Sequence, residues 1–326
     1  MKPLTALLGY ACLPAALTIQ FLCGLAVAQS YPSKPVRLIV PAAPGGPTDV
    51  VARSIAPKLA ESLGQPVVVD NRGGVGGIIG TDIVAKAPSD GHTVAMVFIS
   101  FVTNPALVAK LPYDTLRDFA PVTLIGYQTA VLVVHPSLPV NSVKELIALA
   151  KVRPGKLSYA GDTASAAYLA GELFKYMTGT SIVHVPYKGN APALIDTLAG
   201  HIPFMFNAII TCLPYVKAGK LKALAITSAQ RSSLAAELPT MIESGLPGFE
   251  VSPWYGIVAP VRTPNEVIGR LHSDIVKVLR TPDVKERFSS QGVELIGSTP
   301  EQFDAYIRKE ITKWDKVLTA AGIRAP

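Results

Sequence analysis

The chain has 326 residues, a formal net charge of +7 and a hydrophobic content of 49%. This length exceeds what a single hydrophobic core usually fills, so two domains are expected. The lysines and arginines are scattered singly rather than in long basic runs with interleaved aromatics. This distribution disfavours a nucleic-acid partner and suits a small anionic solute.

The N-terminal segment is apolar from Leu4 to Val27, follows Lys2 and ends in the small-residue motif 26–28. Such a pattern is typical of a secretory signal peptide, with cleavage expected after Ala28. A retained membrane anchor is the alternative, but a proline and a glutamine interrupt the apolar stretch. We therefore expect an exported protein.

Short β-branched runs alternate with helix-length segments through the remaining chain, which predicts an α/β architecture with parallel strands. The expected strands are 36–40, 67–69, 93–98, 131–134, 156–159, 182–185, 203–206 and 221–227. Two longer extended segments, 122–134 and 249–258, are expected to cross between the domains. The first domain would then be discontinuous.

Two helix starts near the C-terminus have capping-box spacing with proline at the first helical position. These are Thr263 to Glu266 and Thr299 to Gln302. Apolar residues follow each of them at four-residue intervals, as expected for helices that face a core.

Glycine-rich junctions between strands and helices are the candidate ligand loops. In the segment 41–49, Gly45 and Gly46 permit close backbone approach, and the following helix start favours a carboxylate or phosphate. A plain tight turn is the alternative, with Thr48 or Asp49 capping the helix and Asp49 pairing with Arg53 one turn on. The glycines of 74–80 miss the spacing of a dinucleotide fingerprint.

Five motifs occur together and in order, at 31–35, 41–49, 71–80, 185–189 and 254–260. They resemble the Bug-type receptors, the TctC-like solute-binding components of tripartite tricarboxylate transporters, over essentially all of the chain after the signal segment. The resemblance implies a type II periplasmic binding protein fold, with two Rossmann-like α/β domains, a hinge and a ligand cleft between them. The expected units are the signal peptide at 1–28, domain 1 at 29–127 plus 252–326, and domain 2 at 128–251.

The resemblance also implies ligand contacts from both domains, with those of the second domain more variable. The first-domain residues expected at the ligand are Pro41, Ala43, Gly45, Gly46, Asp49 and the segment Ile99, Ser100 and Phe101, with Gly76 and Gly77 bordering them. Those expected from the second domain are Thr163, Ser165, Tyr187, Lys188, Gly189 and Asn207. Tyr255 is expected as an aromatic wall, although aromatic residues at strand ends more often belong to a core.

These observations predict a monomeric periplasmic receptor that captures a small carboxylate for integral membrane transporter subunits. The ligand would be a dicarboxylate or tricarboxylate, an aromatic acid or an amino acid. A ligand sensor with a signalling partner is the alternative. A hydrolase would need Ser100 or Ser165 to meet a distant histidine. The five histidines form no catalytic pattern in the sequence, so we expect no enzyme activity, no catalytic residues, no metal and no cofactor.

Overall fold

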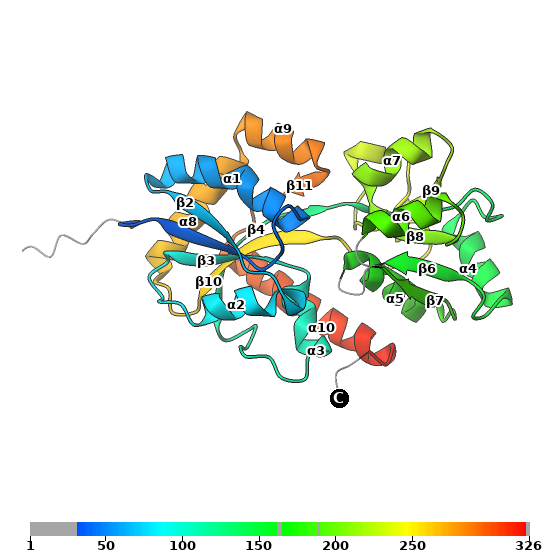
Figure 1. The fold of residues 1–326 in the computed structure, drawn as a ribbon, viewed down its shortest axis with the longest axis horizontal. Coiled ribbons are helices and arrows are strands. Elements are labelled where there is room, and N and C mark those ends of the chain that lie inside the picture. The colour runs from blue at the N-terminus through cyan, green and yellow to red at the C-terminus, as the bar shows by residue number, and fades with distance from the viewer. Residues whose placement is uncertain (1–30, 162–164, 188–189, 324–326) are drawn as a thin grey trace, which may run out of the picture.

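The computed structural model describes residues 31–161, 165–187 and 190–323. They form two lobes side by side, each built on its own β-sheet (Figure 1). The signal peptide expected at 1–28 lies outside the described residues. Within the described ranges, no helix is both long and apolar enough to span a membrane.

The first lobe contains a six-stranded sheet with strand order β11-β4-β10-β3-β1-β2. Its strands are β1 (Val36–Val40), β2 (Val67–Asn71), β3 (Thr93–Phe98), β4 (Phe119–Gln128), β10 (Trp254–Pro260) and β11 (Val293–Leu295). Strand β1 pairs in parallel with β2 and β3, whereas β10 runs antiparallel to both β3 and β4. The expected parallel arrangement is therefore broken by β10, the strand that returns from the second lobe, and by β11, which pairs antiparallel with β4.

The second lobe contains a five-stranded sheet with strand order β7-β6-β8-β5-β9. Its strands are β5 (Ala130–Val134), β6 (Ser158–Gly161), β7 (Val183–Pro186), β8 (Phe204–Ala208) and β9 (Lys222–Ile226). Strand β6 is parallel to β7 and β8, and β5 is antiparallel to β8 and β9. The strand that enters from the first lobe is again the antiparallel one.

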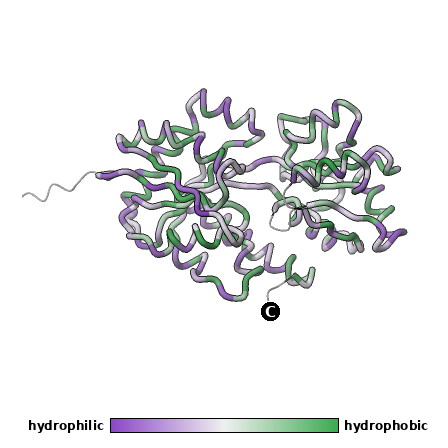
Figure 2. The backbone as a smooth tube through the Cα atoms, viewed as in Figure 1, coloured by the Kyte–Doolittle hydropathy of each residue, from purple (hydrophilic) through white to green (hydrophobic). Residues whose placement is uncertain are grey.

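Helices cover both faces of each sheet. They are α1 (Pro47–Leu63), α2 (Ile78–Ala85), α3 (Ser100–Leu107), α4 (Val143–Val152), α5 (Ala166–Thr178), α6 (Asn190–Leu198), α7 (Ile209–Lys217), α8 (Asn265–Leu279), α9 (Pro282–Ser290) and α10 (Pro300–Ala320). Two short 3-10 turns are η1 (Val75–Gly77) and η2 (Ser233–Ala235). Hydrophobic segments run through the sheets, while many outer turns are hydrophilic (Figure 2).

The chain passes between the lobes at two adjacent places. Thr129 alone separates β4 from β5, and its side chain is fully buried. On the return path, the Val251 N–H donates to the Thr227 carbonyl before β10 begins. The Gln128 N–H donates to the Pro253 carbonyl at 2.6 Å, which joins the two crossings directly. The domain limits at 127/128 and 251/252 stay a prediction.

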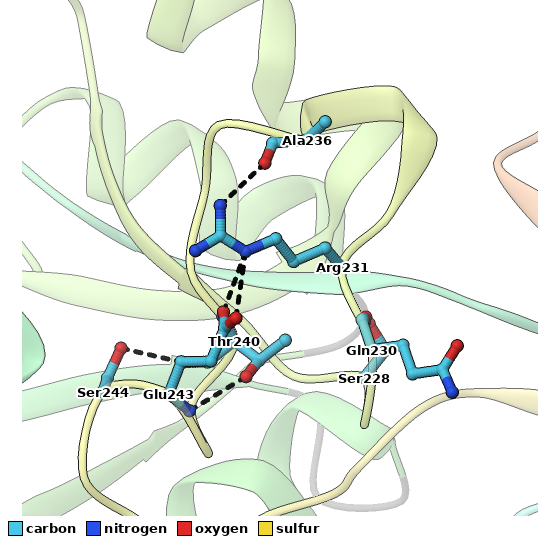
Figure 3. A network of polar contacts seen from close by, with 7 residues as sticks. All are labelled: Ser228, Gln230, Arg231, Ala236, Thr240, Glu243 and Ser244. Carbon is cyan, nitrogen blue, oxygen red and sulfur yellow. Dashed lines mark hydrogen bonds and ion pairs between the residues drawn. The ribbon is translucent and has the colours of Figure 1, made fainter.

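The segment between β9 and β10 has little regular structure and is held by a polar network (Figure 3). The Arg231 guanidinium pairs with the Glu243 carboxylate at 3.0 Å and donates to the Ala236 carbonyl. The Glu243 carboxylate also accepts the Thr240 N–H, and the Thr240 hydroxyl accepts the Glu243 N–H. These side-chain hydrogen bonds satisfy backbone groups that a helix or strand would otherwise pair. They hold the segment that returns to the first lobe.

The two predicted capping boxes have different outcomes. At α10 the box is confirmed, because the Thr299 side chain accepts the Gln302 N–H and the Gln302 side chain accepts the Thr299 N–H. The box predicted at Thr263 is wrong, because α8 begins at Asn265 and has no side-chain cap. The Thr263 N–H closes a turn onto the Pro260 carbonyl, and this turn moves the helix start downstream.

The crossing strand β10 packs tightly on helix α10. A Cβ added at Gly256 would lie 2.2 Å from the Phe303 ring, whereas one added at Gly269 of α8 would meet nothing within 4 Å. We therefore expect Gly256→Ala to lower the free energy of unfolding by about 1–3 kcal/mol through overpacking. Gly269→Ala should raise it by about 0.5–1 kcal/mol, because alanine suits a helix interior better than glycine.

Urea unfolding of the two variants and the wild type measures this difference. Equal midpoints for Gly256→Ala and the wild type would show that α10 yields to the added methyl group.

Candidate functional site

A cavity of about 400 Å³ lies between the lobes. It is lined by Ala42, Pro47, Thr48, Phe98, Ile99, Gln128, Ala130, Ser165, Ala166, Ala167, Asn190, Asn207, Ala208, Pro253, Trp254 and Tyr255. Most of these residues stand where a strand ends and a helix begins. In α/β folds this edge of the sheet is where ligands bind.

The loop between β1 and α1 forms part of the first-lobe wall through Ala42, Pro47 and Thr48. Proline at the first helical position suits a helix start. The preceding Gly45 has φ of 78°, a backbone conformation that favours glycine. The loop therefore brings the N-terminus of α1 to the cavity.

Asp49 holds this loop in shape rather than lining the cavity. Its buried carboxylate accepts the Gly45 N–H at 2.8 Å and pairs with Arg53 at 2.9 Å. Burial would raise the pKa of Asp49, but the hydrogen bonds from Arg53 and Gly45 outweigh it and hold the pKa below its usual value. This is the pairing that the tight-turn alternative predicts for Asp49.

The glycine loop before α2 does not line the cavity but packs against the end of β1, next to the first-lobe wall. Gly76 and Gly77 have φ of 63° and 84°, and a Cβ at Gly77 would lie 2.9 Å from the Pro41 carbonyl oxygen. The Asn104 side chain donates to the Gly76 carbonyl. These glycines let α2 approach the end of β1 closely.

At the start of α3, the residues before the helix line the cavity, whereas the first turn of the helix does not. Phe98 and Ile99 line the cavity, whereas Ser100 and Phe101 are buried beyond it. The Phe101 ring packs edge-on against Phe119 at 5.2 Å, so this side chain belongs to the core.

The second-lobe wall is made by the starts of three helices. Ser165 caps α5, accepting the Tyr168 N–H with its side chain, and Ala166 and Ala167 follow it along the wall. Asn190 opens α6, and Asn207 with Ala208 precedes α7. The three backbone segments direct their helix N-termini at the same space.

Tyr187 lies away from the cavity lining. Its hydroxyl donates to the Asp196 carboxylate at 2.6 Å, and this hydrogen bond, with burial, raises the pKa of Tyr187 to about 12. The ring packs against the apolar cluster under α6 and α7. Tyr187 therefore stabilises α6 through the hydrogen bond to Asp196.

The two chain crossings contribute the remaining side of the cavity. Gln128 and Ala130 come from the outgoing path, and Pro253, Trp254 and Tyr255 from the return path. The Trp254 indole N–H is buried without a hydrogen-bond partner among the described residues. Burial also raises the pKa of Tyr255 well above its usual value, so this hydroxyl is neutral and able to donate.

No charged side chain occurs in the described part of the lining. Its polar side chains are neutral, and five helices, α1, α3, α5, α6 and α7, begin at or beside it. Free N–H groups and the helix dipole give each N-terminus a partial positive charge. The arrangement can stabilise an anion without a formal counter-ion.

Only some of the residues predicted to contact a ligand line this cavity, and their roles in binding stay a prediction. Ser165, Asn207 and Tyr255 line this cavity. The following predicted residues lie outside its lining: Pro41, Ala43, Gly45, Gly46, Asp49, Gly76, Gly77, Ser100, Phe101 and Tyr187. Thr163, Lys188 and Gly189 lie outside the described residues. Gln128 and Asn190 were missed; the junction spacing that singled out Ser165 also applies to Asn190.

Comparison with known proteins identifies the architecture. The family model described as "Tripartite tricarboxylate transporter family receptor" matches residues 51–323. The chain belongs to this receptor family. Protein BugT of Bordetella pertussis is 40% identical over 300 residues, covering 91% of this chain and 92% of the relative.

Solved structures of similar proteins have the same two-lobed, type II periplasmic binding protein fold. The periplasmic binding protein BugD is 36% identical with a TM-score of 0.74, covering 90% of this receptor and 99% of that chain. An R. palustris protein solved with adipate is 38% identical with a TM-score of 0.77, at the same coverage. MatC from Rhodopseudomonas palustris, solved with malate, is 31% identical with a TM-score of 0.74, covering 88% and 100%.

The bonds of the Asp49 carboxylate to the Gly45 N–H and Arg53, called the Asp49 clamp below, predict that the stability of this receptor depends on pH. Because its pKa is lowered in the folded state, ionised Asp49 stabilises the fold above the unfolded value of about 4, and this contribution is lost as pH falls through the lower folded value. Asp49→Asn should reduce the free energy of unfolding at pH 7 by about 1–3 kcal/mol. The difference from wild type should shrink below pH of about 4.

Asp304→Asn is the matched control, because Asp304 pairs with Arg308 at the same helical spacing but on the surface. It should change stability by less than about 0.5 kcal/mol. Denaturant unfolding at a series of pH values measures both variants, and equal costs would contradict the clamp.

Proposed function

We propose that the protein is a periplasmic receptor that captures a small carboxylate in the cavity between its lobes. The observation that carries this proposal is the set of helix N-termini from both lobes around one neutral, largely apolar cavity. A carboxylate gains hydrogen bonds and a favourable dipole at such termini. The apolar walls suit the body of the acid.

Two relatives support a carboxylate ligand. The R. palustris protein was solved with adipate, and MatC was solved with malate. Both acids carry two carboxylates on a short carbon chain, a form that matches positive helix termini on two facing walls. We propose a ligand of this general class and include tricarboxylates, aromatic acids and amino acids in the test.

Export and transport follow from the same proposal. A signal peptide cleaved after Ala28 would release the receptor into the periplasm as a monomer. The lobes, divided at 127/128 and 251/252, would rotate about the two crossings to close on the ligand. The closed form would be recognised by integral membrane subunits of a tripartite tricarboxylate-type transporter. A sensor would have the same ligand site and a different partner.

An enzyme is the less favoured candidate. Among the described residues, one histidine ring interacts with both Ser33 and Asp90. The partners of the other four rings are Ser137, Gly161, Asp196 and Ser298, one for each ring. Ser100 is buried at the start of α3, and the Ser165 hydroxyl accepts the Tyr168 N–H. A hydrolase would use such a serine as a nucleophile toward a histidine. We therefore propose binding without turnover.

A carboxylate placed on the cavity wall tests the proposal. Ala167 occupies the second helical position of α5 and lines the cavity. Ala167→Asp should weaken binding of acids by ~10-fold or more, because like charges meet in a site of low dielectric constant. Calorimetry and thermal shift of residues 29–326 against the acids measure the loss, since a ligand raises apparent stability.

Lys144→Asp is the matched control. Lys144 occupies the second position of α4, which also has a serine cap, but it faces solvent. This change removes more positive charge, yet it should leave affinity within about twofold because surface charges are screened. Absence of binding by the folded, ligand-free wild type would overturn the receptor proposal, and equal losses in both variants would overturn the cavity assignment.

A further inference from the structure

The orientation of one carboxamide determines which chemical group the second lobe accepts. Asn207 is the penultimate residue of β8, is 5% exposed and lines the cavity. Along β8 the side chains alternate, so Asn207 lies on the same face as Met205, the face covered by α6. Asn190, the first residue of α6, lines the same cavity.

The two ends of the Asn207 side chain are not interchangeable. Its Oδ1 accepts the Ala208 N–H at 2.8 Å. A backbone N–H can only donate, so the atom that faces it must be the oxygen. The Nδ2 group is then the other end, and it has no hydrogen-bond partner in the part of the chain that the structure describes.

Other unpaired polar atoms of the lining residues are too buried to meet a ligand. The Trp254 indole N–H has no partner in the described residues, but it has almost no accessible surface. The Asn190 Oδ1 likewise has no hydrogen-bond partner among the residues that the structure describes, and it has almost no accessible surface. A ligand that meets this wall therefore finds an N–H donor at Asn207.

We propose that Asn207 selects a hydrogen-bond acceptor, a carboxylate or carbonyl oxygen, at the second-lobe end of the ligand and rejects an ammonium group there. This inference rests on the proposed carboxylate receptor. An ammonium has only donors, so against Nδ2 it would leave two donors facing each other in a buried site. Unpaired buried polar groups of this kind weaken binding.

Asn207→Asp is a nearly isosteric test. One aspartate oxygen keeps the Ala208 N–H bond at the start of α7, and the second oxygen replaces the Nδ2 donor with a charged acceptor. The probes are dicarboxylates from succinate to suberate and the ω-amino acids of matching chain length, measured by calorimetry. We expect wild type to prefer the dicarboxylates. In the variant their Kd should rise ~10-fold or more, and the Kd of the ω-amino acids should fall by a similar factor.

Asn190→Asp is the matched control, because it adds the same charge to the same cavity from α6. It should weaken the dicarboxylates without reversing the preference. If Asn207→Asp keeps the wild-type preference, or if Asn190→Asp reverses it equally, the role of Asn207 is overturned while the receptor proposal stands. If wild type prefers ω-amino acids, the inference also fails. If wild type binds none of the probes and none of the other acids, the receptor proposal itself fails.

Discussion

The pairing of the two chain crossings fixes the relation between the sheets. The Gln128 N–H donates to the Pro253 carbonyl at 2.6 Å, so the outgoing and returning paths lie side by side. Each crossing supplies its new sheet with an antiparallel strand, β5 in one lobe and β10 in the other. The parallel strands β1 and β3, and β6, β7 and β8, then end toward the same space. A cavity surrounded by helix starts is the consequence of this topology.

The charged side chains near the site lie outside the described cavity lining, where they pair with one another. Formal charges near the loops are paired with one another, as in Asp49 with Arg53 and Arg37 with Asp70, and these pairs fix the backbone. The cavity wall itself uses backbone termini and neutral side chains. A fixed dipole costs less to desolvate than a buried ion, so a ligand carboxylate can bind and leave without exposing an unpaired protein charge.

The sequence predicted local structure well where one physical signal dominated. The β-branched runs at 36–40 and 93–98 coincide with β1 and β3, and the reciprocal bonds of Thr299 and Gln302 open α10. The same spacing failed at Thr263, because a turn onto Pro260 competed with the cap. Local pattern does not include such a neighbouring turn.

The site was less predictable because lining depends on tertiary packing. Glycine motifs located the loops, but they do not indicate that Ala42 rather than Ala43 lines the cavity. Gln128 and Pro253 are far apart in sequence and meet only through the paired crossings. Asn207 was predicted to bind, yet its direction follows from one hydrogen bond to the Ala208 N–H, which the sequence does not reveal.

Contacts on both sides of the crossings constrain how the cavity can open. The space beside Gly292 is limited by Ile210 of the other lobe, at 2.5 Å from where a Cβ would lie. On another side, α10 packs against α5, and one apolar cluster includes residues of both lobes. A change in the relative orientation of the lobes would therefore have to alter the packing of α10 against α5. The start of α5, which lines the cavity, is thus part of the same packed unit as α10.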